Sequence, residues 1–161
     1  MAGEEEQMIV RPIREGTVID HIPAGRALTV LKILGITGSE GYRVAIVMNV
    51  ESRKLGRKDI VKIEGRRLKR EELDRIALIA PSATVNIVEN YRVVKKTKVS
   101  LPRHLQNIIR CTNPTCITRQ PREPIVPRFN LVSRRPLLYQ CLYCGTLIDE
   151  GDIVKQLGAS Q

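Results

Sequence analysis

The sequence predicts an α+β protein in which a ferredoxin-like βαββαβ sandwich is followed by a small antiparallel-β domain built around a metal. Two observations predict this arrangement. Residues 1–102 alternate between strand-like and helix-like hydrophobic patterns, and all four cysteines fall within residues 103–161. The segment Ser100-Leu101-Pro102-Arg103 favours an extended connector, because proline disfavours helix in the residue before it. We therefore expect two domains, at residues 1–102 and 103–161.

The first half of the sandwich is predicted from a strand, a helix and a second strand. Thr17 to Ile22 is rich in β-branched residues and is typical of a strand. Pro23 is a favoured first residue of a helix. Apolar residues then recur at helical spacing at Ala24, Ala27, Leu28 and Leu31. The largely apolar segment from Arg43 to Val50 predicts the next strand.

The second half repeats the pattern, with strands predicted at Asp59–Glu64, Thr84–Val88 and Tyr91–Val99. In the first of these, Val61 and Ile63 share one face, and Ile60 and Lys62 share the other. A helix between the first two strands is indicated by Leu73, Ile76, Ala77 and Ala80, and Pro81 ends it. The first six elements match the split-βαβ arrangement, which hosts many functions and so indicates none by itself.

Composition and charge narrow the function classes. The 161 residues carry 27 Lys and Arg against 17 Asp and Glu, a net charge of +10 that favours a phosphate-bearing partner. One Phe, four Tyr and no Trp weaken any function that depends on stacking nucleic-acid bases. No apolar run reaches the roughly 18 residues of a membrane helix, and the acidic N-terminus lacks a secretory signal. We expect a cytoplasmic protein that does not contact a membrane.

The cysteines form two close pairs, Cys111-x4-Cys116 and Cys141-x2-Cys144, separated by 24 residues. This is the arrangement of a structural tetrathiolate zinc site, and four thiolates leave no coordination position for a catalytic water. Two disulfides would be the plainer explanation, but the chain has no export signal. A redox pair at Cys141 and Cys144 would leave Cys111 and Cys116 unexplained. We expect one structural zinc ion, and we read His104 as a surface or linker residue.

Catalytic motifs are absent, and several polar residues admit two interpretations. The sequence has no phosphate-binding glycine loop, no His-Glu-x2-His and no Gly-x-Ser-x-Gly. Asp20-His21 could be a helix-capping carboxylate beside a satisfied histidine, or an acceptor for sugar hydroxyls beside a phosphate donor. Lys62 and the pair Lys95-Lys96 could equally be solvated charges. Asn86 and Tyr91 could be surface residues of strands.

Several blocks of sequence resemble the regulatory chain of aspartate carbamoyltransferase. Together with the cysteine pattern they extend from about residue 10 to residue 150. The blocks are Thr17-Val18-Ile19-Asp20-His21-Ile22-Pro23-Ala24, Gly56-Arg57-Lys58-Asp59, Lys62-Ile63-Glu64, Ala80-Pro81-x-Ala83-Thr84-Val85-Asn86, Asn90-Tyr91-x-Val93-Val94 and Ser100-Leu101-Pro102.

The resemblance implies a protein that is not itself an enzyme. It implies an N-terminal domain that binds nucleotide and pairs with its own copy, and a C-terminal zinc domain that docks on the catalytic chain. In the family, CTP inhibits and ATP activates carbamoyl transfer to aspartate, the committed step of pyrimidine synthesis. Nucleotides would act by binding two states of the holoenzyme unequally.

The resemblance also implies roles for individual residues. Asp20 and Lys62 would bind the ribose and the edge of the base, and His21 and Lys96 would bind the phosphates. Ile13, Tyr91 and Val93 would line the base, with Asn86 nearby, and Asn113 would contact the catalytic chain. Adjacent strand residues point to opposite faces, so Asp20 and His21 can reach one ligand only if the strand ends or bends there.

The sequence departs from the family pattern at a few positions. Arg11-Pro12 replaces an acidic residue and an alanine, which removes an amide donor and adds a cation. Lys95 adds another cation, and Thr115 replaces an expected asparagine. These changes leave the balance between CTP and ATP open.

Two other functions compete with this interpretation. A zinc-ribbon nucleic-acid-binding protein would explain the charge and the cysteine spacing, and it predicts strongly salt-dependent binding. A zinc-dependent hydrolase would need an open coordination position, which four cysteines deny.

Overall fold

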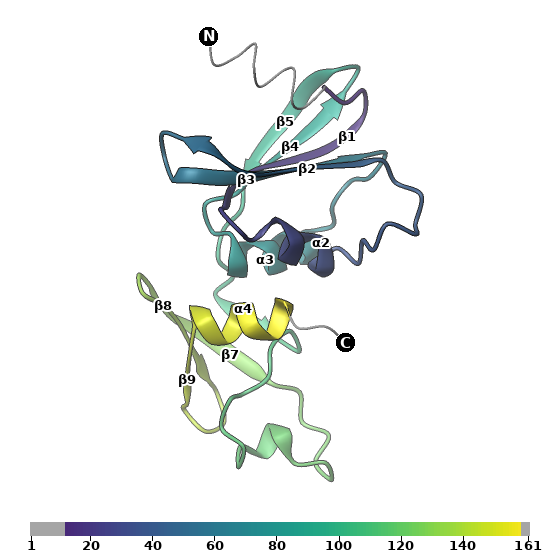
Figure 1. Cartoon of the computed structure of the whole chain (residues 1–161). Helices are drawn as coiled ribbons and strands as arrows, with labels where there is room; N and C mark the ends of the chain where they lie inside the picture. Colours follow the sequence, from purple (N-terminus) through teal and green to yellow (C-terminus); the bar gives the residue numbers. More distant parts are fainter. Residues whose placement is uncertain (1–11, 159–161) are drawn as a thin grey trace.

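Two antiparallel sheets, one in each half of the chain, organise the computed structural model, which describes residues 12–158 (Figure 1). The first sheet has the strand order β2-β3-β1-β4-β5 and the second the order β6-β7-β8-β9. The elements of the first domain are β1 (Gly16–Pro23), α2 (Ala27–Ile33), β2 (Val44–Ser52), β3 (Gly56–Glu64), α3 (Arg70–Ile79), β4 (Thr84–Glu89) and β5 (Arg92–Lys98). This confirms the predicted α+β class, and β5 extends the ferredoxin-like sheet by one strand.

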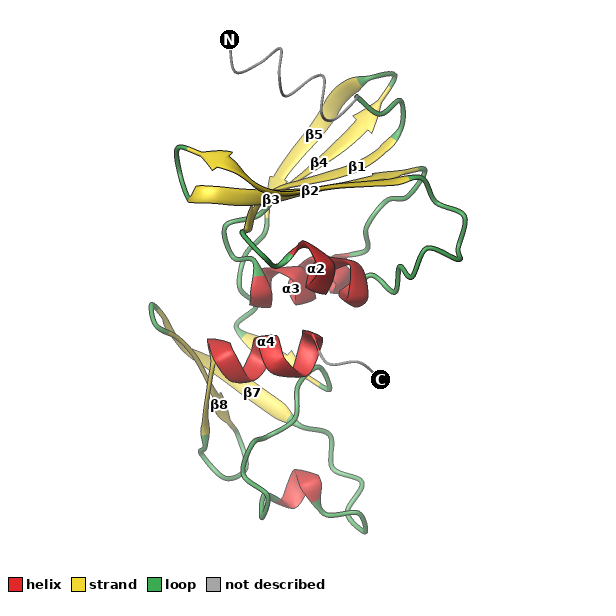
Figure 2. Cartoon of the chain, in the orientation of Figure 1, coloured by secondary structure: helices red, strands yellow, loops and turns green. Residues whose placement is uncertain are grey.

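The apolar face of the first sheet packs against helices α2 and α3, which both lie on one side of it (Figure 2). Ile19 in β1 and Val61 and Ile63 in β3 are fully buried, together with Val30 of α2 and Ile76 of α3. The alternation predicted for β3 is therefore correct, and Ile60 and Lys62 lie on the face that the helices leave uncovered. No described helix has both the length and the apolar character needed to span a bilayer.

The start of the first helix differs from the prediction. Pro23 is the last residue of β1, where it lies opposite Lys58, and α2 begins only at Ala27. Gly25 has a positive φ of 92°, and the turn that it forms separates strand from helix. Leu28, placed on the apolar helix face by its spacing, is 55% exposed. The buried stripe of α2 keeps Ala27 and Leu31 from the prediction and takes Val30 in place of Leu28.

The second domain contains four short strands and a terminal helix. Its elements are β6 (His104–Gln106), the 3-10 helix η1 (Ile117–Arg119), β7 (Arg128–Arg134), β8 (Leu137–Cys141), β9 (Leu147–Asp149) and α4 (Glu150–Gly158). Helix α4 was not predicted. It lies between the two sheets and packs against both α2 and α3, so the apolar cores of the two domains are continuous (Figure 1).

Candidate nucleotide and metal sites

A row of polar side chains crosses the open face of the first sheet. Val18 lies opposite Lys62 in β3 and Asn86 in β4, and Asn86 lies opposite Lys96 in β5. Residues that are directly paired across strands share a face, so Lys62, Asn86 and Lys96 project from the same side of the sheet. That side is the one opposite α2 and α3. Three residues far apart in sequence are thus aligned by strand register alone.

A β-bulge at the end of β1 brings Asp20 and His21 to this face. The pairing of β1 with β3 shifts between Ile19 and Ile22, and His21 has a positive φ of 57°. The His21 ring nitrogen Nδ1 lies 3.0 Å from Thr84 Oγ1, and Thr84 is the partner of Asp20 in β4. The bulge therefore overcomes the alternation that would otherwise send these two neighbours to opposite faces.

Two cations that sequence reasoning did not single out complete this end of the sheet. Lys58 Nζ lies 3.0 Å from Asp20 Oδ1, with the two side chains only 13% and 24% exposed. Lys58 belongs to the block Gly56-Arg57-Lys58-Asp59, so its place in the sequence was a usable signal. Lys54, on the β2–β3 hairpin, lies close enough to act on the charge of His21. A surface cavity of about 940 Å³, lined by His21, Asn49, Arg53, Lys54 and Lys58 among others, opens beside these groups.

The electrostatics of His21 follow from these neighbours. Burial lowers the pKa of His21, Asp20 opposes that shift, and Lys58, Lys54 and Lys96 lower the pKa further. Burial likewise lowers the pKa of Lys62, and Asp20 again opposes the shift. For His21, burial and the three lysines together outweigh the carboxylate of Asp20. An anion among these groups would raise the pKa of His21 and make it a better hydrogen-bond donor.

The three residues that the family resemblance places beside the base lie in different environments. Ile13 is buried, whereas the side chains of Tyr91 and Val93 are 65% and 58% exposed. Tyr91 is in a two-residue hairpin turn, and its backbone N–H donates to the carbonyl oxygen of Arg14 at 3.0 Å. Val93 is paired with Val88, two residues from Asn86, so it shares the open face. Arg11, which departs from the family pattern, lies outside the described residues.

The four cysteine thiols converge in the second domain. The sulfur atoms of Cys111, Cys116, Cys141 and Cys144 all lie within 4.8 Å of one another, and the thiols are free. The Sγ atoms of Cys111 and Cys144 are 3.5 Å apart, and those of Cys116 and Cys141 are 3.8 Å apart. A tetrahedral ion with metal–sulfur bonds of about 2.3 Å requires separations of about 3.8 Å. The cluster therefore has the dimensions of a four-thiolate metal site.

The surroundings of the thiols also fit a bound cation. Burial raises the pKa of Cys111 to about 12 and also raises that of Cys141, so these sulfurs need a nearby positive charge to ionise. The hydroxyl groups of Thr118 and Thr146 lie 3.1 Å from the sulfurs of Cys116 and Cys144. Hydroxyl groups at that distance can donate to thiolates and orient them toward a metal.

Asn113 holds the turn between the first two cysteines. Its Oδ1 accepts from the Thr115 backbone N–H at 3.1 Å and from the Thr115 hydroxyl at 2.9 Å. Thr146 lowers the pKa of the Cys144 thiol, and the Asn113 side chain contributes a smaller lowering. In the isolated chain Asn113 thus shapes the cysteine turn, and Thr115 takes part in the same hydrogen-bond network.

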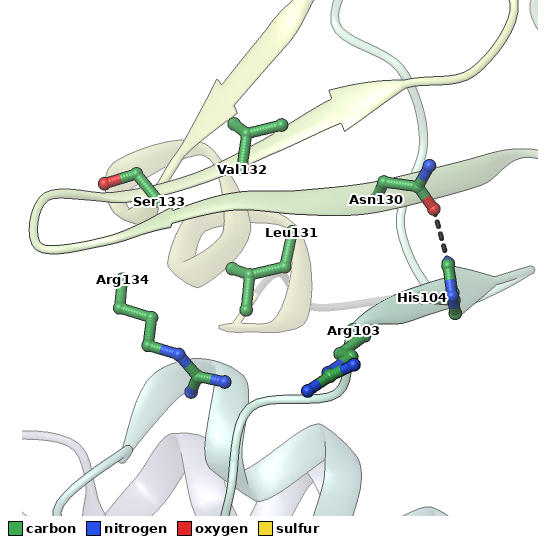
Figure 3. Close-up of a pocket in the computed structure, with 7 residues that line it drawn as sticks. All are labelled: Arg103, His104, Asn130, Leu131, Val132, Ser133 and Arg134. Atoms are coloured by element: carbon green, nitrogen blue, oxygen red, sulfur yellow. Dashed lines mark hydrogen bonds between the residues drawn. The ribbon is translucent and has the colours of Figure 1, made fainter.

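A separate depression lies along β6 and β7 of the second domain. Figure 3 shows Arg103 and Arg134 extending toward the same space beside Leu131, while His104 is hydrogen-bonded to Asn130. His104 is an exposed residue of β6, as expected of a surface residue, and it is not one of the clustered metal-ligating groups.

Comparison with known proteins adds sequence evidence to this geometry. The family described as "Aspartate carbamoyltransferase regulatory chain, allosteric domain" matches residues 8–100. The companion family, described as its "metal binding domain", matches residues 103–154. The chain belongs to the family of aspartate carbamoyltransferase regulatory chains. As such it is a non-catalytic, regulatory subunit.

Individual regulatory chains match over nearly their whole length. The aspartate carbamoyltransferase regulatory chain of Hyperthermus butylicus is 68% identical over 150 residues, which cover 93% of this chain and 94% of the relative. That of Korarchaeum cryptofilum is 59% identical over 153 residues, covering 95% and 98%. That of Metallosphaera sedula is 55% identical over 150 residues, covering 93% and 94%. The resemblance identified from short blocks of sequence is therefore confirmed.

Proposed function

We propose that residues 1–102 bind a nucleoside triphosphate, CTP or ATP, and that residues 103–161 bind one zinc ion and dock on the catalytic chain of aspartate carbamoyltransferase. CTP would inhibit and ATP would activate the partner enzyme, in the pyrimidine pathway of the cytoplasm. The observation that carries the nucleotide proposal is the convergence of Asp20, His21, Lys62, Asn86 and Lys96 on the open face of one sheet.

The chemistry of this face suits a nucleotide. The Asp20 carboxylate can accept from ribose hydroxyls, and Lys58 already holds it in place. His21 and Lys96 can make charge-assisted hydrogen bonds to phosphate oxygens. Asn86 and Lys62 can bond the edge of a base, with Ile13, Tyr91 and Val93 providing apolar contact. The backbone and side chains of a sheet supply these contacts, so no glycine-rich phosphate loop is needed.

Calorimetric titration of the zinc-loaded chain with CTP and then ATP tests this site. Lys96→Ala should weaken binding about tenfold or more, since a hydrogen bond between charged groups is lost. Lys95→Ala is the matched control, because Lys95 is paired with Ile87 and projects from the opposite face of the same strand. Equal affinities for the two variants, or no binding by a folded chain, would contradict the proposal.

Zinc is the metal that the donor set favours. Four soft thiolates at tetrahedral spacing suit Zn²⁺ and leave it coordinatively closed, so the ion would hold the fold together without any hydrolytic role. Asn113, at the cysteine turn, would present that turn to the catalytic chain. Titrating the thiols of the assembled complex with a mercurial should release zinc and free the catalytic chains, which sedimentation would detect. A complex that survives zinc release would contradict this role.

Edge strand β2 is the surface we propose for pairing with a second copy of the chain. It forms one border of the five-stranded sheet, and Tyr42 and Ile46, just before and within it, are 41% and 38% exposed. Unpaired strand edges recruit further strands, and exposed apolar groups favour the contact. Sedimentation equilibrium of the wild-type chain should give a dimer, and Ile46→Lys should shift it toward monomer. The zinc-ribbon nucleic-acid alternative is not favoured, given the family.

A further inference from the structure

Arg26 bridges the junction of the two domains, where Lys32 of α2 also donates to the Gly158 carbonyl oxygen of α4 at 2.7 Å. Arg26 immediately precedes α2, and its Nη1 donates to the carbonyl oxygen of Ile79, at the end of α3, at 2.6 Å. The same nitrogen lies 2.7 Å from Oε1 of Glu150, the first residue of α4. The Arg26 and Glu150 side chains are 26% and 45% exposed, so solvent reaches the pair only in part. Arg26 thus connects all three helices at the domain boundary.

A buried carboxylate fixes the backbone on both sides of Arg26. Asp59 in β3 is fully buried, and its Oδ2 accepts from the N–H groups of Gly25 at 2.8 Å and Ala27 at 3.0 Å. Its Oδ1 accepts from the N–H of Asn49 at 2.9 Å. Asn49 occupies a bulge in β2, with a φ of 62°. One ionisable side chain therefore sets the position of a β2 bulge and the start of α2 together.

Asp59 also adjoins the residues that we propose to bind nucleotide. Its sequence neighbour Lys58 pairs with Asp20, and both Lys58 and Asn49 line the cavity beside His21. A second connection leads from His21 to α3, because the Ser82 hydroxyl donates to the His21 carbonyl oxygen at 2.7 Å. A ligand that moved Lys58 or His21 would therefore be connected to the backbone at the start of α2, through Asp59, and just beyond the end of α3, through Ser82.

We propose that Asp59 and Arg26 form a relay by which nucleotide occupancy on the first sheet changes the position of α4 and, with it, the metal-binding domain. This inference rests on the proposed nucleotide site. Both residues are positioning residues, since neither lies on the open face of the sheet. The partial exposure of the Arg26–Glu150 pair suits a switch, because an ion pair open to solvent is weak and is easily exchanged for water.

Amide hydrogen exchange in the full-length, zinc-loaded chain tests the relay. Addition of CTP should change the exchange rates of the α4 amides in the wild-type protein. In Arg26→Met that change should shrink by at least about twofold, while the Kd for CTP stays within about twofold of wild type. Glu150→Gln removes the interdomain charge pair and leaves the Arg26–Ile79 bond, and it should give the same reduction. The double variant should add little, since both changes break one contact.

Arg67→Met is the matched control, because Arg67 pairs with Glu89 within the first domain. It should leave the α4 response to CTP unchanged. A full α4 response in both Arg26→Met and Glu150→Gln would overturn the relay, as would a wild-type chain that binds CTP without any α4 response. If Arg26→Met does not fold, the α4 response of Glu150→Gln to CTP tests the relay by itself. Absence of CTP binding to the wild-type chain would instead overturn the proposed nucleotide site.

Discussion

The two domains are stabilised by different means. The first sheet is covered by two helices, and their shared core includes fully buried Ile19, Val61, Ile63 and Ile76. The second sheet has strands as short as three residues, and its cysteine turns converge on one point. The first domain thus rests on apolar burial, whereas we expect the second, with its smaller sheet, to need its four sulfur ligands as well. We therefore expect that the two can be disrupted separately, although α4 joins their cores.

The largest effect should come from removing the metal ligands. Cys116→Ser should unfold the second domain, because structural zinc contributes about 10–16 kcal/mol of apparent binding free energy. Hydrogen-exchange protection should disappear from β6 to β9 and persist in β1, β3 and β4. Ser133→Ala, in β7 of the same domain, is a control that should leave protection unchanged. Loss of protection in both sheets together would show that the domains are not separable.

Removal of the buried Asp59 carboxylate should instead destabilise the first domain. Asp59→Ala should lower the free energy of unfolding by about 3 kcal/mol or more, because three buried or partly buried N–H groups lose their acceptor. Denaturant titration of the zinc-loaded chain would measure this change in the free energy of unfolding. Glu51→Ala, an exposed carboxylate on β2, should cost less than about 0.5 kcal/mol. Similar losses for the two variants would mean that the buried carboxylate is not what holds the β2 bulge and the start of α2.

A substitution of Thr118 tests how far metal binding depends on the hydroxyl groups around the four cysteines. Thr118→Val should weaken zinc affinity about tenfold, since the hydroxyl group near Cys116 is replaced by a methyl group of similar size. Competition with a chromophoric chelator would measure the change. Thr112→Val, at an exposed position between Cys111 and Cys116, serves as the control. An unchanged zinc affinity in Thr118→Val would show that this hydroxyl group does not contribute to metal binding.

The smallest effect concerns the pH dependence of the proposed nucleotide site. The pKa of His21 is below its usual value in the free chain, and neighbouring phosphates would raise it. Binding would therefore take up a proton, and affinity for CTP should rise a few-fold as pH falls from 8 to 6. His21→Gln should remove this pH dependence. Calorimetry in buffers of different ionisation enthalpy would show the change as a loss of proton uptake on binding. Proton uptake that persists in the variant would assign the titration to another group.

Periodicity and register explain how much of this molecule follows from its sequence. The alternation of Val61 and Ile63 with Ile60 and Lys62 predicted the buried face of β3, and register then aligns Lys62 with Asn86 and Lys96. A bend at His21 followed only as a condition for its sharing a ligand with Asp20. The bulge at Asn49 was not predicted, because it depends on Asp59, whose carboxylate accepts from N–H groups 10 to 34 positions away. No local pattern reports such contacts.

Helix α4 was missed although local signals for it exist. Ile153, Val154 and Leu157 have helical spacing, and Ile153 is fully buried. The Asp152 N–H donates to Asp149 Oδ1 at 2.9 Å, and the Asp149 N–H donates to Asp152 Oδ2 at 3.2 Å, a reciprocal cap. An acidic pair three residues apart before an apolar repeat could have predicted this helix.

The lysines of β5 have a consequence for solubility. Among residues 12–158 this strand borders the sheet with no further strand beside it, as β2 does at the other border. It carries Lys95, Lys96 and Lys98, whereas β2 carries Ile46. Like charges on a sheet border repel another copy of the same strand and so oppose fibre growth. A lineage that no longer used nucleotides would still gain from keeping these charges. Persistence of lysine in β5 is therefore weak evidence of effector binding, and Asp20 and His21 are better positions at which to look for its loss.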